Sequence, residues 1–154
     1  MIDAGEIIHG LWQGSAPPHG AILSDSGYDM VVLCALEFQP PAKAFPGVHV
    51  LRAPLVDVAD IVDDATLLAR VRPVVDDVVR AVRTGHTALV TCYMGLNRSG
   101  FIAGLALHEL SGWTGDACVR RIRDVRGPYA LSNSQFRRIV TSYPIIDDWA
   151  LTFA

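Results

Sequence analysis

The chain has 154 residues, of which 51% are hydrophobic and 19% are charged, a composition typical of one compact globular domain. Thirteen basic and sixteen acidic side chains give a net charge of −3, which argues against a broad basic surface for nucleic acid. Any site for an anion must therefore be local. We expect a single domain over residues 1–154.

The cysteine pattern and the first residues bear on compartment and cofactors. Cys34, Cys92 and Cys118 are odd in number and lack Cys-x-x-Cys spacing, so neither a disulfide framework nor a zinc site is indicated. The first residues are acidic where a signal peptide is basic, and no apolar stretch approaches the roughly 18 residues that span a bilayer. We therefore expect a cytoplasmic monomer that needs no cofactor or metal and binds neither nucleic acid nor membrane.

Apolar runs of strand-like and helix-like length alternate along the chain and predict an α/β domain. We expect a three-layer arrangement in which helices flank a small, mostly parallel central sheet. Strands are expected at residues 7–13, 30–36, 48–55 and 87–92. Helices are expected at residues 65–83, 100–110, 116–125 and 132–142, with one or two further turns at 145–154.

Two helix details follow from local signals. Asp63 and Asp64 stand where the helix at 65–83 needs its N-cap, and Pro73 either kinks that helix or starts a second one. Ser132 and Gln135 match a capping box, with Ser132 as the N-cap and Gln135 three residues inside the helix.

The join between the strand at 87–92 and the next helix is the most informative segment. Cys92 ends the strand, and a short loop containing Gly95 leads into the helix, so backbone N–H groups and the helix dipole converge on one point that favours an anion. The same field is expected to favour the thiolate form, which makes Cys92 a nucleophile. Arg98 can present a planar fork to two phosphate oxygens.

The residues from Cys92 to Ser99 read Cys-Tyr-Met-Gly-Leu-Asn-Arg-Ser. This segment resembles the Cys-x-x-Gly-x-x-Arg-Ser loop of the cysteine-dependent protein tyrosine phosphatases, and the small size of the chain resembles their dual-specificity branch. Residues 11–15 and 125–136 are similar to family segments before and after that loop. Thr91 departs from the family, which has a histidine there that helps to hold the thiolate environment.

The resemblance implies phosphoryl transfer in two steps through a phosphocysteine, without a metal. Cys92 attacks phosphorus, while Arg98 and the loop amides stabilise the phosphate oxygens. Ser99 assists Cys92 as a leaving group when water cleaves the intermediate. The phosphate-binding loop between the central strand and the helix consists of Tyr93, Met94, Gly95, Leu96 and Asn97.

An aspartate must serve as general acid and then as base. Pro54-Leu55-Val56-Asp57 resembles the family segment at the end of the preceding strand, which favours Asp57. Asp60 is the rival, because it precedes Cys92 by 32 residues, close to the usual family separation, whereas Asp57 precedes it by 35. A strand-end motif constrains position more than a loop length does, so we prefer Asp57.

Three further features have two interpretations each. Asn133 either supports the phosphate-binding loop, as the resemblance implies, or only caps its own helix. Cys34 lies on a strand that resembles the one bearing a second cysteine in phosphatase and tensin homologue enzymes, so it is either a redox partner of Cys92 or a small core residue. The arginine run at 120–126 either attracts an acidic substrate or forms a solvated helix face.

These features predict a phosphatase for phosphotyrosine in proteins, extending to phosphoserine and phosphothreonine, or for another phosphomonoester. The uncharged Tyr93, Met94 and Leu96 argue against a phosphoinositide-directed phosphatase. Residues 95–101 also resemble the loop of RNA 5′-triphosphatases, against which the net charge argues. The remaining alternative is a phosphate-binding module without turnover.

Overall fold

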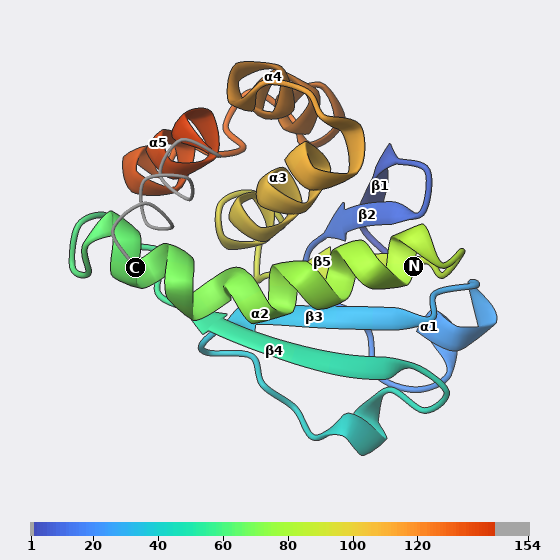
Figure 1. Cartoon of the computed structure of the whole chain (residues 1–154). Coiled ribbons are helices and arrows are strands. Elements are labelled where there is room, and N and C mark those ends of the chain that lie inside the picture. Colours follow the sequence, from blue (N-terminus) through green and yellow to red (C-terminus); the bar gives the residue numbers. More distant parts are fainter. Residues whose placement is uncertain (1, 144–154) are drawn as a thin grey trace.

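The computed structural model describes residues 2–143 and places a five-stranded sheet beside a group of helices (Figure 1). The strands are β1 (Ala4–Ile8), β2 (Leu11–Gly14), β3 (Met30–Ala35), β4 (His49–Leu55) and β5 (Ala88–Thr91). The helices are α1 (Ile22–Asp25), α2 (Asp64–Arg83), α3 (Arg98–Ser111), α4 (Gly115–Arg126) and α5 (Ser134–Ser142), with a 3₁₀ turn at η1 (Ala42–Ala44). The turns expected at 145–154 lie outside the described residues.

The strand order is β1-β2-β5-β3-β4, with β1 antiparallel to β2 and every other pair parallel. The expected α/β class with a mostly parallel sheet is therefore confirmed. Strand β5 lies in the centre, so the loop that follows it emerges in the middle of the carboxyl edge of the sheet. This edge is where ligands of parallel sheets usually bind.

Both faces of the sheet are covered, which explains the unbroken apolar run in β3. Met30, Val32 and Cys34 belong to the large core that the sheet shares with α2, α3, α4 and α5. Val31 and Leu33 point to the other face, where a smaller core includes Leu23 of α1. The three layers are thus unequal, because α2, α3, α4 and α5 share the large core, whereas the smaller core contains only the four-residue helix α1 and the segments beside it.

The first predicted strand was wrong in one respect. Residues 7–13 do not form one strand, because Gly10 has a left-handed φ of 86° and turns the chain between β1 and β2. His9 and Gly10 interrupt the apolar pattern at this point, and the strand prediction did not take this turn signal into account.

Pro73 lies inside a single helix of 20 residues, α2, and so does not start a second helix. The N-cap of α2 is Asp63, whose Oδ1 accepts a hydrogen bond from the Thr66 amide at 2.8 Å. Among residues 2–143, no helix is long and apolar enough to cross a membrane.

Candidate active site

The phosphate loop, residues 92–99, begins where β5 ends and runs into the first turn of α3. Thr91 precedes it and is buried, and its hydroxyl donates to the Val32 carbonyl at 2.7 Å. This side chain therefore ties β5 to β3 directly below Cys92. The position that carries histidine in the family serves here as a link between strands.

The carbonyl groups of the phosphate loop are held by surrounding elements. The Tyr93 carbonyl accepts from the Ala16 amide at 3.2 Å, and the Leu96 carbonyl accepts from the Leu131 amide at 3.2 Å. Within the part of the chain that the structure describes, the amides of residues 93–97 donate to no other group. The loop thus directs its acceptors outward and keeps its donors available for an anion.

Gly95 is held by two side chains and has no room for a side chain of its own. Its carbonyl accepts from Gln13 Nε2 at 3.1 Å and from Arg126 Nε at 3.0 Å. Its φ is 72°, and a Cβ placed on it would lie 2.7 Å from the backbone of Gly14 and of Ser15. Only glycine fits this position, as the sequence motif requires.

Cys92 and Ser99 face each other across the loop. The Cys92 thiol donates to Ser99 Oγ at 3.2 Å, and Gln13 Nε2 donates to the same oxygen at 3.2 Å. Both side chains are buried. Gln13 Nε2 donates a hydrogen bond to Ser99 Oγ, so the Ser99 hydroxyl hydrogen does not need to point toward Gln13. It can point to the Cys92 sulfur once the thiol has become a thiolate.

Arg98 is held in place by Glu37, which follows β3. Arg98 Nη1 donates to Glu37 Oε2 at 2.6 Å and to the Leu55 carbonyl at 3.2 Å, and Nη2 donates to Glu37 Oε1 at 2.5 Å. These hydrogen bonds lower the pKa of Glu37 to about 2 and raise that of Arg98. Glu37 is therefore ionised at neutral pH and orients the guanidinium.

The second edge of the guanidinium remains available. Glu37 occupies the edge formed by Nη1 and Nη2, while Arg98 Nε is buried and has no partner among the described residues. A guanidinium presents five N–H donors in a fixed plane, so Nε and the second proton of Nη2 form another two-pronged edge. This edge matches two oxygens of a phosphate group.

The two candidate acids have different surroundings. Asp57 Oδ2 accepts from Asn97 Nδ2 at 3.1 Å, and its Oδ1 accepts from Asn133 Nδ2 at 2.9 Å. The Asp60 carboxylate instead pairs with Arg138 of α5 at 2.7 Å. Asp57 therefore contacts the phosphate loop directly, whereas Asp60 does not.

Asn133 caps its own helix, and its side chain also contacts the candidate acid Asp57. Its Oδ1 caps α5 by accepting from the amides of Gln135 and Phe136, and its Nδ2 donates to Asp57. The expected capping box was therefore wrong, since Asn133 is the N-cap and Ser132 precedes it. The Ser132 hydroxyl donates to Asn97 Oδ1 at 3.3 Å instead.

Cys34 lies beside Cys92 in the sheet. The register of β3 and β5 pairs Leu33 with Thr91, so the two cysteines are the next residues on neighbouring strands. Strands lie about 4.8 Å apart, within the Cα separation of about 4.4–6.8 Å that a disulfide spans. Both thiols are free and buried, and burial raises the pKa of Cys34 well above its usual value. The geometry is thus compatible with the redox partner and the core residue alike.

The arginine run at 120–126 is neither a solvated face nor a substrate patch as a whole. Arg121 Nε donates to the Ile7 carbonyl at 2.8 Å, Arg123 Nε donates to the Ala130 carbonyl at 2.9 Å, and Arg126 bridges Gly95 and Asp3. The solvated-face interpretation was incomplete, because these three guanidinium groups bind backbone carbonyls outside α4 and, for Arg126, the Asp3 carboxylate as well.

Three residues of the site escaped sequence reasoning. Glu37 and Gln13 contact Arg98 and Ser99 across 61 and 86 residues of chain, and Asn97 was expected only to line the loop. Gln13 gave one signal, since an amide within an apolar strand is buried and must find partners.

Among the described residues no group of three or more His, Cys, Asp or Glu side chains could hold a metal.

Known proteins place this geometry in context. No protein-family model matches the chain, and no curated protein matches it in sequence. Solved structures do match: human DUSP28 has a TM-score of 0.77 and 28% identity over 94% of this chain and 95% of that one. A mouse putative dual specificity phosphatase, crystallised with zinc tungstate, has a TM-score of 0.77 and 28% identity over 96% and 90%. Tk-PTP in its active form shares the fold, with a TM-score of 0.74 and 20% identity over 91% and 95%.

Proposed function

We propose that this chain, which belongs to the cysteine-dependent protein tyrosine phosphatase superfamily and has a dual-specificity-like fold, hydrolyses phosphate monoesters through a phosphocysteine on Cys92. The observation that supports this most directly is the pairing of a buried cysteine, 3.2 Å from Ser99 Oγ, with an arginine that Glu37 holds by two hydrogen bonds. Nucleophile and phosphate-binding fork are thereby preorganised on one loop.

In the first step, the Cys92 thiolate attacks phosphorus and the bond from phosphorus to the ester oxygen breaks. The free edge of Arg98 and the amides of residues 93–97 bind the phosphate oxygens as negative charge builds up on them. Asp57, which Asn97 and Asn133 hold at the loop, supplies a proton to the departing oxygen. The product of this step is the free alcohol or phenol.

In the second step, water attacks phosphorus and the thiolate leaves. Asp57 accepts the proton of that water, and the Ser99 hydroxyl donates to the departing Cys92 sulfur. Gln13 fixes the orientation of that hydroxyl by donating to its oxygen. Inorganic phosphate is released, and the site returns to its starting state.

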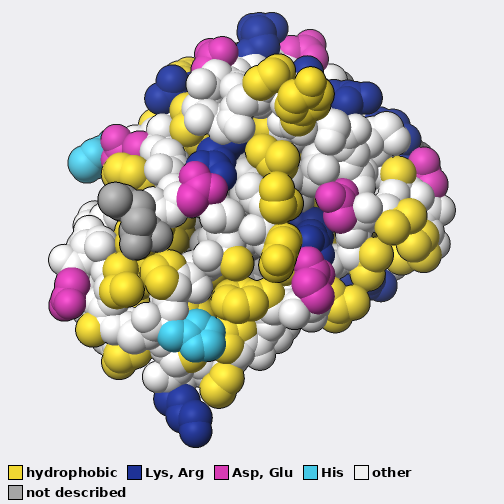
Figure 2. Space-filling model, turned by 180° about the vertical axis from the view of Figure 1, so that it is seen from behind, with side chains coloured by type: hydrophobic (Ala, Val, Ile, Leu, Met, Phe, Trp, Pro, Cys, Tyr) yellow, Lys and Arg dark blue, Asp and Glu magenta, His cyan; other side chains and the backbone are white. Residues whose placement is uncertain are grey.

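The surface around the site supports a protein substrate. Tyr93 and Met94 are exposed by 56% and 63%, and Leu36 and Val56 are about half exposed. The face of the molecule seen from behind in Figure 2 has hydrophobic side chains in several groups with charged side chains between them. The uncharged, exposed Tyr93 and Met94 beside the site fit phosphotyrosine, phosphoserine or phosphothreonine on a polypeptide better than a ligand with several phosphates.

The decisive assay is hydrolysis of p-nitrophenyl phosphate in the presence of a metal chelator, with Cys92→Ser as the control. We expect turnover by the wild-type protein, competitive inhibition by tungstate, and loss of turnover in Cys92→Ser. A phosphopeptide panel then ranks phosphotyrosine against phosphoserine and phosphothreonine. Turnover that survives Cys92→Ser would contradict the covalent mechanism, and phosphopeptide binding without turnover would identify a binding module.

A further inference from the structure

The acid loop, residues 56–62, joins β4 to α2 and carries Asp57. Val58 and Ile61 are exposed by 52% and 68%, and they line a cavity of about 310 Å³ together with Gln135 and Phe136 of α5. A loop that lies over a cavity gains little from apolar packing. Polar contacts must therefore determine where this loop sits.

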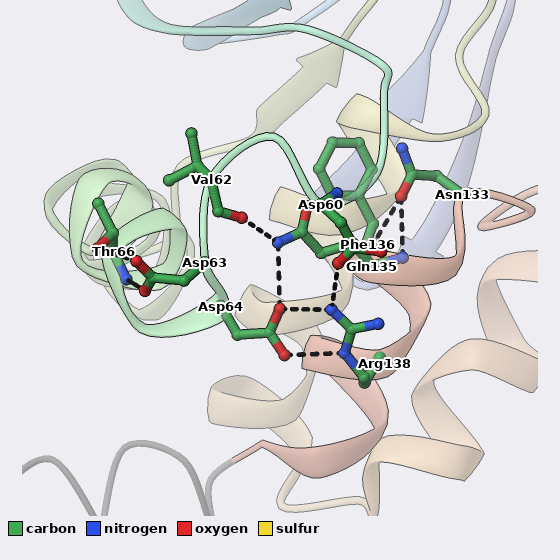
Figure 3. A network of polar contacts seen from close by, with 9 residues as sticks. All are labelled: Asp60, Val62, Asp63, Asp64, Thr66, Asn133, Gln135, Phe136 and Arg138. Atoms are coloured by element: carbon green, nitrogen blue, oxygen red, sulfur yellow. Dashed lines mark hydrogen bonds and ion pairs between the residues drawn. The ribbon is translucent and has the colours of Figure 1, made fainter.

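Gln135 provides three of these contacts from inside the protein (Figure 3). Its side chain is almost fully buried, at 1% exposure. Its Oε1 accepts from the Asp60 amide at 2.8 Å, and its Nε2 donates to the Val62 carbonyl at 2.5 Å and to Asp64 Oδ1 at 3.1 Å. One amide side chain thus binds two backbone groups of the acid loop and the Asp64 carboxylate at the start of α2.

Arg138, one turn further along α5, holds the same loop from outside. It donates from Nη2 to Asp60 Oδ1 at 2.7 Å and to Asp64 Oδ1 at 2.6 Å, and from Nε to Asp64 Oδ2 at 2.8 Å. Asp60 has a left-handed φ of 63°, which is unfavourable for a residue with a Cβ. Its backbone amide and its carboxylate are both bound by side chains of α5, so α5 stabilises this conformation of the loop.

We propose that Gln135 and Arg138 are positioning residues that hold the acid loop, and with it Asp57, over the phosphate loop. Asp57 lies three residues before Asp60 on the same loop, and Asn133 at the start of α5 contacts the Asp57 carboxylate. Gln135 acts through the Asp60 amide and the Val62 carbonyl, whereas Arg138 acts through the Asp60 carboxylate. Neither side chain forms a hydrogen bond with Asp57 or with the phosphate loop among the described residues. This inference rests on the proposed function, because it assigns Asp57 the proton transfer.

A positioning role differs from a merely structural one in its dependence on the leaving group. Proton donation matters for phenol, a poor leaving group, and matters little for p-nitrophenol, which is much more acidic. We expect Gln135→Met and Arg138→Gln to lower kcat for phenyl phosphate about tenfold, and kcat for p-nitrophenyl phosphate less than about threefold. Arg138→Lys should restore part of the loss because it keeps one charged donor.

Two controls make the test specific. Arg80→Gln removes another surface arginine paired with an aspartate, on α2 and away from the acid loop, and should change neither rate. In an Asp57→Asn background, Gln135→Met should cause no further loss on phenyl phosphate, because both changes remove the same proton transfer. Equal losses on the two substrates, or additive losses in the double variant, would overturn the proposal.

Hydrogen exchange tests the placement of the loop without any activity. In Gln135→Met the Asp60 amide should exchange faster, while amides of β3 and β5 keep their protection. Unchanged exchange at Asp60 would overturn the proposal.

The kinetic outcomes separate this proposal from the proposed function. If the wild-type protein turns over both substrates and Gln135→Met leaves the ratio of kcat for phenyl phosphate to kcat for p-nitrophenyl phosphate unchanged, only the positioning role is contradicted. A wild-type protein that turns over neither substrate contradicts the proposed function and, with it, this role.

Discussion

The phosphate loop and the acid loop bring the reacting groups together but are stabilised in opposite ways. Cys92 and Ser99 are 4% and 0% exposed, and backbone and side-chain contacts from β2, α4 and residue 131 hold the phosphate loop. The acid loop is exposed, overlies a cavity, and depends on side chains of α5.

This difference separates two parts of the chemistry. Groups that bind phosphate and attack phosphorus must keep their distances in every step, and here they are part of the folded core. The group that moves a proton is placed by a few polar contacts at the surface. Loss of Cys92 or Arg98 from the phosphate loop should therefore abolish turnover, whereas changes in or behind the acid loop should alter the dependence of turnover on leaving group and pH.

The largest effect is expected from the phosphate-binding fork. Arg98→Ala removes the donors for two phosphate oxygens, and we expect kcat/KM for p-nitrophenyl phosphate to fall at least about 10³-fold. Glu37→Gln keeps the guanidinium and should cost much less. Steady-state kinetics of both variants provide the measurement, and an Arg98→Ala variant that keeps a tenth of wild-type activity would remove Arg98 from the mechanism.

The choice between the two aspartates gives the next largest effect. Asp57→Asn should lower kcat for phenyl phosphate about 10²–10³-fold, because the acid itself is lost. Asp60→Asn weakens only the contact with Arg138 and should cost about tenfold or less. If the larger loss on phenyl phosphate belongs to Asp60→Asn, our assignment of the acid is wrong.

A smaller effect is expected from Ser99→Ala. The variant lacks the hydroxyl that donates to the departing sulfur, so the phosphocysteine should accumulate and its hydrolysis should slow about tenfold. Rapid mixing with p-nitrophenyl phosphate should then give a burst of p-nitrophenol followed by a slow phase. A uniform slowing without a burst would place the role of Ser99 in the first step.

Oxidation should distinguish the two interpretations of Cys34 without changing the resting activity. If Cys34 is a redox partner, peroxide oxidises the Cys92 sulfur to a sulfenic acid, and attack by Cys34 releases water and forms a disulfide. We expect a Cys34–Cys92 crosslink by mass spectrometry and recovery of activity with dithiothreitol, which Cys34→Ala should lose. Absence of the crosslink would leave Cys34 as a core residue.

The smallest effect concerns stability in acid. Arg138 lowers the pKa of Asp64 below its usual 3.8, so this pair stabilises the fold above that value and loses its effect as pH falls through the lower, folded pKa. Both side chains are partly exposed, at 46% and 27%, so we expect less than about 1 kcal/mol. Urea unfolding should show that Arg138→Gln destabilises the protein at pH 7 and that the difference shrinks below about pH 3.8.

Local patterns were sufficient to predict the central part of the molecule. The apolar run of β3 and the Cys92–Ser99 motif correctly indicated a doubly covered strand and a strand–loop–helix site, because each depends on residues close in sequence. Asp57 was preferred for its place at a strand end, and the structure puts its carboxylate against Asn97 and Asn133.

The missed features depend on distant partners or on one residue's backbone. Nothing near Glu37 or Gln13 in sequence indicates that they contact Arg98 and Ser99, because only the folded sheet brings them together. The predictions at Gly10 and at the start of α5 were wrong for a different reason. More than one nearby residue could form the turn or the N-cap, and the folded structure selects Gly10 and Asn133.

Phe101 and Phe136 stack with ring centroids 4.7 Å apart and an angle of 8° between their planes. One ring belongs to the first turn of α3, just after Arg98, and the other to the first turn of α5, just after Asn133. Helix α3, which begins at the phosphate loop, therefore packs ring against ring on α5, whose side chains bind the acid loop. Through this ring contact, a change in the tilt of α5 would reach the first turn of α3 as well as the acid loop.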